Sequence, residues 1–254
     1  MWLSVITAPS ELSESCWRKL WNVCDFTRLH AEMDSRFQMK NDKLVPEYPL
    51  VIFGAGGLAH ELWGWIKGAN DCEPRKRVTA FVVDGVPTSE HYDDIPIMSR
   101  EQAGQLGVVE YLIAIADPLS RKRLSAELDA LGWIAGRYIH ESAMLGVKLS
   151  IGKGTMIFPR CSISSDATLG EHVLVNGGTA IGHDCVIGSY SSLLGGASIN
   201  GGVTLGEGVL VGAGAIIHPG KKVGDGAIVG MGSAVFRHVA AEQTVFGNPA
   251  RPLC

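Results

Sequence analysis

The chain has 254 residues and a formal net charge of −4, which is enough length for two domains and the wrong sign for a nucleic-acid-binding surface. No stretch is apolar for long enough to predict a membrane span. The six cysteines stand at scattered spacings with no CxxC pair. Together with a start that lacks the basic region of a signal peptide, they predict a reduced, cytoplasmic protein without a disulfide framework.

Residues 1–48 form an N-terminal extension whose role the sequence does not indicate. Within it, residues 10–23 place four apolar side chains at helical spacing just after a proline. We expect a helix that packs on the next domain or on a partner subunit. A membrane-surface helix is disfavoured because the few basic residues are mixed with acidic ones.

Residues 49–138 alternate short apolar runs with segments of helical pattern. The predicted strands are 50–53, 78–83, 95–98 and 111–115, and the predicted helices are 58–67 and 118–131. Strands that alternate with helices indicate a small parallel sheet of Rossmann type.

A glycine-rich turn, GAGG, follows the first predicted strand and contains Gly54, Gly56 and Gly57. Such a turn brings backbone N–H groups next to a helix N-terminus, which suits a phosphate or pyrophosphate. Asp84, at the end of the second strand, can accept a hydrogen bond from a ribose hydroxyl or a base. The spacing is shorter than the full dinucleotide fingerprint, so a nucleotide-sugar, NAD and a turn without ligand all fit it.

From Leu145 to Ala240 the chain repeats every six residues, sixteen times without a gap. The first residue of each hexapeptide is Leu, Ile or Val, the fifth is mostly small, and the second is glycine in nine of them. This period indicates a β-helix with three hexapeptides per triangular coil. We expect first and fifth positions to fill the prism, and second-position glycines to supply unusual backbone angles at its corners. Ile139 begins one further hexapeptide, which gives a repeat domain of 139–240 and leaves 241–254 as an irregular arm.

Only one of the four histidines in the repeat, His183, occupies the third position of its hexapeptide. Asp184 follows it, and Gly201 lies one coil further in the same column. We expect open space beside this imidazole, in which a thioester can bind. A solvated surface histidine is the competing interpretation, because it fits most histidines on a β-helix.

Several motifs occur together and in one order: GAGG, FVVD, IAIADPLSRKRL, NGGTAIGHDCVIG, the hexapeptides and VFGNPARPL. In this combination the chain, from about Leu50 to Leu253, resembles the PglD/NeuD-like family, which contains the sialic-acid O-acetyltransferases and the bacillosamine-pathway nucleotide-sugar acetyltransferases. The resemblance implies an α/β, Rossmann-like N-terminal domain followed by a left-handed parallel β-helix. It also implies a homotrimer with active sites between adjacent β-helices.

The activity that the resemblance implies is acetyl-CoA-dependent N-acetylation of a nucleotide-linked amino sugar, with UDP as the expected nucleotide, for bacterial surface glycans or glycoproteins. His183 is then the general base and Asp184 the acid paired with it. The implied substrate-binding residues are Gly54, Gly56, Gly57, Asp84 and Asn176. Acetyl-CoA is implied to run along Gly201, Ala213 and Met231, and no metal is expected.

The chain departs from the family at the sugar-binding end. Leu58 and Ala59 stand where many members have His-Gly, Ser192 stands where some carry a second histidine, and Asp84 follows Val83 in place of a second acid. These differences bear on the identity of the sugar more than on the chemistry.

Three alternatives accompany this reading. The first is a sugar O-acetyltransferase that uses the same site, and the second is a nucleotide-sugar-binding scaffold without catalysis. The third is a β-helix metal lyase, which needs three histidines on one zinc ion. Its candidates, His172, His183 and His218, occupy different positions in their hexapeptides.

Overall fold

The computed structural model describes residues 48–68 and 78–253, which belong to one compact unit, Glu47–Cys254. The helix expected at 10–23 lies outside the described residues. Within them, no helix combines the length and the apolar character needed to cross a membrane. The predicted domain boundaries stay predictions.

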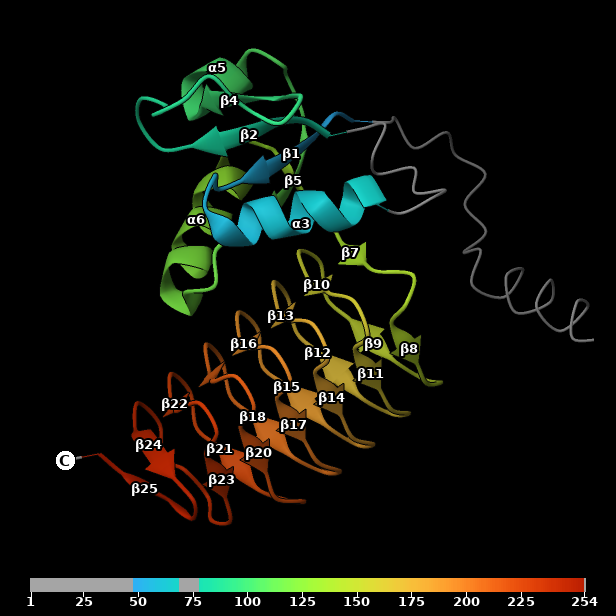
Figure 1. The fold of residues 1–254 in the computed structure, drawn as a ribbon, viewed down its shortest axis with the longest axis vertical. Helices are drawn as coiled ribbons and strands as arrows, with labels where there is room; N and C mark the ends of the chain where they lie inside the picture. The colour runs from blue at the N-terminus through green and yellow to red at the C-terminus, as the bar shows by residue number, and fades with distance from the viewer. Residues whose placement is uncertain (1–47, 69–77, 254) are drawn as a thin grey trace, which may run out of the picture. The chain divides into compact units, whose positions relative to one another are not determined.

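The N-terminal part is a six-stranded sheet in the order β3-β4-β2-β1-β5-β6 (Figure 1). The strands are β1 (Leu50–Phe53), β2 (Val78–Val83), β3 (His91–Tyr92), β4 (Ile95–Ser99), β5 (Glu110–Ile113) and β6 (Ile134–Ala135), and the helices are α3 (Gly57–Gly68), α5 (Arg100–Gly104) and α6 (Pro118–Ala130). All neighbouring strands are parallel except β3, which is antiparallel to β4. The four expected strands and two expected helices are confirmed to within two residues. Sequence periodicity missed β3 and α5 because they are too short to show one.

The remainder is a parallel β-helix of two-residue strands that recur every six residues. These strands are β7 (Tyr138–Ile139), β8 (Met144–Leu145), β9 (Ser150–Ile151), β10 (Met156–Ile157), β11 (Ser162–Ile163), β12 (Thr168–Leu169), β13 (Leu174–Val175), β14 (Ala180–Ile181), β15 (Val186–Ile187), β16 (Ser192–Leu193), β17 (Ser198–Ile199), β18 (Thr204–Leu205), β19 (Leu210–Val211), β20 (Ile216–Ile217), β21 (Lys222–Val223), β22 (Ile228–Val229) and β23 (Ala234–Val235). Each strand from β7 to β20 pairs with the third strand after it, as Met156 does with Leu174, so one coil takes three hexapeptides as expected.

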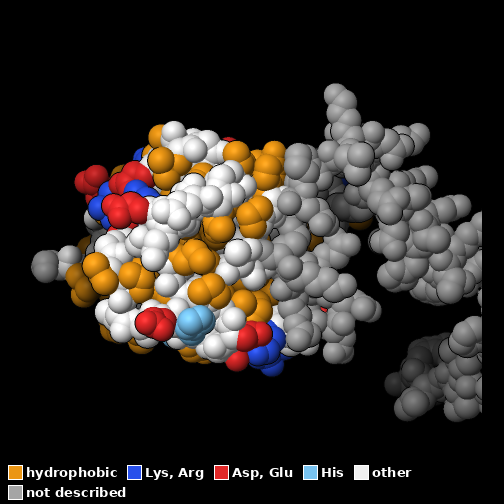
Figure 2. Space-filling model, turned by 90° about the horizontal axis from the view of Figure 1, so that it is seen from above, with side chains coloured by type: hydrophobic (Ala, Val, Ile, Leu, Met, Phe, Trp, Pro, Cys, Tyr) orange, Lys and Arg blue, Asp and Glu red, His pale blue; other side chains and the backbone are white. Residues whose placement is uncertain are grey.

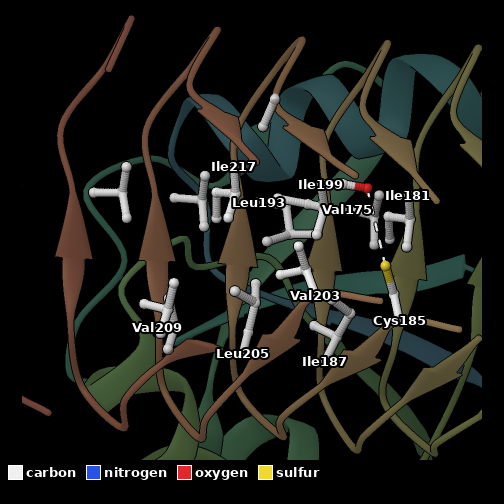
Figure 3. Packing of buried hydrophobic residues seen from close by; sticks show 14 of the residues in the cluster. Val175, Ile181, Cys185, Ile187, Leu193, Ile199, Val203, Leu205, Val209 and Ile217 are labelled. Atoms are coloured by element: carbon white, nitrogen blue, oxygen red, sulfur yellow. Dashed lines mark hydrogen bonds between the residues drawn. The ribbon is translucent and has the colours of Figure 1, made fainter. Parts of the chain in front are cut away.

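The interior of the prism is filled as the repeat predicts. First-position residues such as Val175 and Leu193 and fifth-position residues such as Cys185 and Val203 point into one continuous core (Figure 3). Large aliphatic and small side chains therefore alternate around each coil, which lets a narrow prism reach close packing.

The reason given above for the second-position glycines is wrong. The left-handed backbone conformation occurs at the fourth position of the hexapeptide, as in Gly154 with φ 71° and Gly202 with φ 69°. Second-position glycines are needed because the next coil passes directly above them. A Cβ on Gly188 would lie 2.2 Å from the carbonyl oxygen of Gly206, which is far inside van der Waals contact.

The C-terminal arm is also more regular than expected. Strand β24 (Thr244–Gly247) pairs in parallel with β22, and Val245 is buried in the prism core, so this strand continues the β-helix. The chain then turns through a cis bond between Asn248 and Pro249, and β25 (Ala250–Pro252) returns antiparallel to β24. The glycine and prolines that suggested an irregular arm stand in and after this turn.

Two of the contacts that join the sheet domain to the β-helix are largely buried. One is apolar, because α3 and the first face of the prism share a core that contains Trp63, Ile66, Met156 and Leu174. The other is a fully buried cation, Arg121 of α6.

The guanidinium of Arg121 binds oxygen atoms from both parts of the chain. Its Nε donates to the carbonyl of His172 at 2.8 Å, and its Nη2 donates to the carbonyl of Tyr190 at 2.5 Å and to the Ser192 hydroxyl at 2.9 Å. Its Nη1 donates to the carbonyl of Ile115 at 2.6 Å, which fixes the segment before α6. Burial lowers the pKa of Arg121 to about 10, so the side chain stays charged at neutral pH.

Replacing Arg121 by alanine should therefore destabilise the fold strongly. Several buried carbonyl oxygens would lose their donors, and we expect a loss of about 3 kcal/mol or more in the free energy of unfolding. Urea unfolding measures the change. Arg123→Ala is the matched control, because Arg123 lies on the exposed side of α6 and should change stability by no more than about 0.5 kcal/mol. Similar losses in the two variants would contradict this role of Arg121.

Candidate active site

His183 and Asp184 lie in the corner between β14 and β15, where the backbone turns from one face of the prism to the next. The Nδ1 atom of His183 is 2.7 Å from Oδ2 of Asp184, and both side chains are about two-thirds exposed, at 69% and 66%. Asp184 has φ 58°, a left-handed conformation that Asp tolerates better than most residues. With the carboxylate on Nδ1, the other ring nitrogen, Nε2, is the one available to a ligand.

The imidazole of His183 lies directly against Gly201 of the next coil. A Cβ on Gly201 would be 2.5 Å from Nε2 of His183, so no side chain fits there. The space expected beside His183 is filled by its own imidazole ring. A ligand must therefore approach Nε2 from the outer side of the corner. The imidazole of His183 can take this position only because residue 201 is a glycine.

The predicted residues do not converge within one chain. Asn176, Ala213 and Met231 follow β13, β19 and β22, which lie in one sheet, whereas His183 and Gly201 follow β14 and β17, which lie in another. The two groups therefore occupy two different corners of the prism, with a complete face between them. Asn176 is half-buried and accepts a hydrogen bond from the Gly177 N–H at 2.6 Å, while Ala213 and Met231 are exposed.

The glycine-rich turn has the form expected for an anion-binding loop. Gly54 has φ 114° and donates its N–H to the carbonyl of Val82 at 2.8 Å, which extends the pairing of β1 with β2 into the turn that joins β1 to α3. Gly56 and Gly57 are exposed, with open space where a Cβ would stand. In the first turn of α3 the N–H groups of Ala59 and His60 bind the carbonyl of Gly56, which leaves those of Gly57 and Leu58 to face a ligand.

A cavity of about 400 Å³ opens beside this turn. Its lining includes Ala55, His60, Asp84, Thr88 and Tyr92. The rings of His60 and Tyr92 are stacked, with centroids 3.4 Å apart and planes 1° from parallel, so they form one wall. Sequence reasoning missed both residues, because Tyr92 belongs to the two-residue strand β3 and His60 lies one helical turn beyond the glycines.

Asp84 is held in place by Arg100, a second residue that sequence reasoning missed. Nη2 of Arg100 lies 2.6 Å from Oδ1 of Asp84, and its Nη1 donates to Glu127 at 2.7 Å. The guanidinium also lies over the ring of Phe53, 5.3 Å from the centroid. One carboxylate oxygen of Asp84 is therefore engaged, and the other is free to accept from a ribose hydroxyl or a base.

Charge is mixed on the face of the molecule shown in Figure 2. Acidic and basic side chains gather in the same small groups there, with apolar side chains between them. This surface offers no broad basic field to an anion, in keeping with the net charge of −4.

His172 is buried, unlike the solvated surface position that fits most histidines on a β-helix. It is 1% exposed and lies between Tyr111 and Tyr190, with ring centroids 6.0 and 5.5 Å away. Neither ring nitrogen has a hydrogen-bond partner among the described residues. Burial lowers the pKa of His172 to about 4, against an ordinary value of 6.5, so the ring is neutral.

The zinc-lyase alternative gains no support from the histidine positions. His172 lies at the corner between β12 and β13, whereas His183 and His218 lie at another corner, two coils apart. No cluster of three metal-ligating side chains occurs in the described parts of the chain. Cys185, next to Asp184, points into the core, and burial raises its thiol pKa, so it does not serve as a nucleophile.

Known proteins match this chain by structure. No family model and no curated protein sequence matches it. WeeI from Acinetobacter baumannii AYE has a TM-score of 0.75 and 28% identity, over 81% of this chain and 99% of that one. PerB from Caulobacter crescentus, in complex with CoA and GDP-perosamine, has a TM-score of 0.73 and 26% identity, over 81% and 97%.

A third match is a histidine mutant of perosamine N-acetyltransferase from Caulobacter crescentus, with a TM-score of 0.74 and 25% identity over 81% and 97% of the two chains. These neighbours confirm the predicted fold class, a Rossmann-like domain followed by a left-handed parallel β-helix. Each of these neighbours aligns over almost its whole length, and each alignment covers about four-fifths of this chain.

The buried His172 predicts a specific pH dependence of stability. Its folded pKa is lowered, so its neutral state contributes stability above pH 6.5 that is lost as the pH falls towards 4. Asp129 partly offsets the shift, while Lys153 and Arg121 add to it. We expect roughly 2 kcal/mol of this contribution to be lost between pH 7 and pH 5.

The measurement is urea unfolding of the wild type and of His172→Asn at both pH values. Asparagine tolerates the left-handed backbone of this position, φ 53°, and does not titrate. The variant should be less stable throughout but should lose less on acidification. The same loss in both proteins would mean that His172 is not the group that titrates.

Proposed function

From the premise that this chain is a hexapeptide-repeat nucleotide-sugar acetyltransferase, as its motifs and structural neighbours indicate, we propose that it transfers the acetyl group of acetyl-CoA to the amino group of a nucleotide-linked amino sugar. The observation that carries the mechanism is the exposed imidazole of His183, held by Asp184 at 2.7 Å. We place the reaction in the cytoplasm, in the biosynthesis of a bacterial surface glycan or glycoprotein.

In this mechanism the sugar nitrogen attacks the thioester carbonyl carbon of acetyl-CoA. Nε2 of His183 takes the proton from the nitrogen, the C–S bond breaks, and the CoA thiolate leaves. The carboxylate of Asp184 fixes the orientation of the ring and stabilises its protonated form. General-base assistance of this kind is worth roughly 10²–10⁴-fold, and backbone N–H groups of the corner can stabilise the oxyanion.

The complete site requires a second copy of the chain. The expected base and the expected partner residues Asn176, Ala213 and Met231 lie at two different corners of one prism. In a homotrimer the corner with His183 of one subunit can face the corner with Asn176 of the next, and three identical sites result. We therefore propose a homotrimer with acetyl-CoA between adjacent β-helices, along Gly201 of one subunit and Ala213 and Met231 of another.

The glycine-rich turn and Asp84 bind the nucleotide in this proposal. The N–H groups around Gly56 and Gly57 bind the diphosphate, Gly54 closes the turn, and Asp84, oriented by Arg100, accepts a hydrogen bond from the nucleoside. UDP is the nucleotide that the family resemblance implies. GDP is a specific competitor, because PerB was solved with GDP-perosamine.

An O-acetyltransferase remains the second candidate, because the same base serves a sugar hydroxyl as well as an amine. A non-catalytic nucleotide-sugar-binding protein is less well supported, since the His183–Asp184 pair and the glycine opposite it are all in place. A screen of UDP-, dTDP- and GDP-linked amino sugars and of sialic acid with acetyl-CoA distinguishes these activities.

Replacing His183 by alanine should remove most of the activity and keep the fold. The side chain lies outside the prism core, so the coil should still form, while kcat should fall on the order of 10²-fold or more for lack of the base. Asp184→Asn should have a smaller effect. The activity is measured with the acceptor that the wild type acetylates best.

The same variant tests the assembly. Mixed trimers of His183→Ala and Asn176→Ala subunits should regain activity, because some of their sites combine two intact corners. His140→Ala is the control for His183, since His140 is a partly exposed histidine at the start of the β-helix. Wild-type kcat in His183→Ala, or a stable monomer in light scattering, would contradict the proposed site.

Replacing Gly56 by valine should weaken nucleotide-sugar binding selectively. The position has open space and an ordinary backbone conformation, so the variant should fold, but the added side chain would cover the N–H groups meant for the diphosphate. We expect a KM for the nucleotide-sugar at least about tenfold higher, with the KM for acetyl-CoA little changed.

Gly64→Val is the matched control, because Gly64 lies in α3, the helix that follows the turn, and also has open space around it. It should leave both KM values near those of the wild type. An equal effect of Gly56→Val on the two substrates would argue against phosphate binding at this turn.

A further inference from the structure

We propose that Arg160 binds an anionic oxygen of the acceptor substrate, either in the diphosphate of the nucleotide-sugar or in a carboxylate of the sugar. This inference rests on the proposed function, because it takes the acceptor to lie between the sheet domain, Asn176 and His183 of a neighbouring subunit. Arg160 follows β10, at the corner one coil before the corner that carries Asn176.

The backbone of Arg160 is in a conformation that disfavours a side chain. Its φ is 57°, in the left-handed region, where residues other than glycine are strained. The same position in the four following coils is occupied by Gly178, Gly196, Gly214 and Gly232, with φ between 64° and 72°. The chain therefore keeps a large side chain where its own repeat uses glycine, and strain of this kind points to a function for the side chain.

No contact within the described part of the chain explains the arginine. Lys148 and Asp166, which share its backbone conformation, form an ion pair at 3.7 Å. The exposed guanidinium of Arg160 has neither an ion pair nor a hydrogen bond among the described residues. Its backbone N–H donates to the Ser142 hydroxyl at 3.0 Å, which fixes the corner but not the cation. The positive charge is thus available to a ligand.

The corner of Arg160 lies against α3, the helix that begins at the glycine-rich turn. Phe158, two residues before Arg160, belongs to the apolar core that α3 shares with the prism. On the preceding coil, the ring of His140 lies 5.9 Å from the ring of Trp65 in α3. Because α3 has 12 residues and is about 18 Å long, the corner lies within roughly this distance of the turn proposed to bind the diphosphate.

On its other side Arg160 adjoins the corner that carries Asn176. The Gly178 N–H donates to the carbonyl of Pro159 at 3.0 Å, so the two corners are in backbone contact. A Cβ on Gly177 or Gly178 would meet no atom nearer than 3.5 Å, so open space lies before both glycines. One coil spans about 4.8 Å, and an arginine side chain is longer than that. Its guanidinium can therefore reach a ligand that lies beside Asn176.

An arginine in this place suits an anion. The guanidinium is planar and presents parallel N–H groups, which match the paired oxygens of a phosphate or a carboxylate. A nucleotide-sugar brings its diphosphate from the glycine-rich turn, and an acidic sugar brings a carboxylate of its own. Both groups offer the same chemistry to Arg160, and the choice of acceptor in the experiment separates them.

The test uses full-length Arg160→Gly, which removes the guanidinium and gives this corner the residue of the following coils. The variant should melt no lower than the wild type, because glycine adopts this φ without strain. With acetyl-CoA as donor, KM is measured for UDP- and GDP-linked neutral amino sugars and for sialic acid. Calorimetry gives Kd for UDP and GDP alone.

If Arg160 binds the diphosphate, KM for the nucleotide-sugar and Kd for its free nucleotide should both rise at least about tenfold. If it binds a carboxylate, KM should rise for sialic acid and stay unchanged for the neutral nucleotide-sugars. KM for acetyl-CoA should stay near the wild-type value in either case. Arg160→Lys should regain part of the affinity, because it restores the charge without the planar fork.

Lys148→Gly is the matched control, because Lys148 is also exposed, has φ 55° and occupies the same position of its hexapeptide. It removes the same charge at a different corner and should leave every KM unchanged. An unchanged KM for all acceptors in Arg160→Gly, or an equal rise for acetyl-CoA, would overturn the role of Arg160 and leave the proposed function standing. Dissociation of the variant into monomers would also overturn it, since the arginine would then hold a neighbouring subunit. A wild type that neither binds nor acetylates these acceptors would overturn both proposals.

Discussion

The buried guanidinium of Arg121 fixes the sheet domain on the β-helix. It takes its partners from carbonyl oxygens of two neighbouring corners, at His172 and Tyr190, and from the segment that leads into α6. A guanidinium is planar and carries five N–H donors, so its acceptors must lie in fixed directions around it. The contact therefore sets the orientation of α6 and also keeps the helix on the β-helix. The glycine-rich turn belongs to the same sheet, and its position relative to the coils follows from this contact.

The stacking of coils is the second constraint, and it explains which residues the corners use. Every coil must pass within van der Waals distance of the next, so a glycine stands wherever the backbone above leaves no room. The same close approach places His183 against Gly201. Side chains that could act on a ligand stand at the outward-turning corners. Each face of the prism packs against the core on its inner side and is flat on its outer side. A corner offers one or two side chains, and in the proposed homotrimer a complete site combines corners from two chains.

Much of this could be predicted from the sequence, because the six-residue period directly encodes the coil and its core. The period also placed His183 at an outward corner beside Asp184. It could not show that His172 is buried, since the burial comes from Tyr111, far away in the chain. Likewise Arg100 and Arg121 read as ordinary helix residues, and only tertiary contacts give them their partners. The error over second-position glycines arose because a repeat shows which residue recurs but not the reason for it.

The final hairpin has a consequence for how the protein behaves at high concentration. A parallel β-helix ends in a coil whose strands have unpaired N–H and C=O groups, and a second β-helix could continue the stack there. In this chain β25 folds back antiparallel on β24 and occupies the edge of that sheet, so another molecule cannot extend this face of the prism. Loss of the last few residues would leave the edge of β24 open to pairing with another chain. Truncation at this end would therefore favour filament growth while the interior of each subunit remained intact.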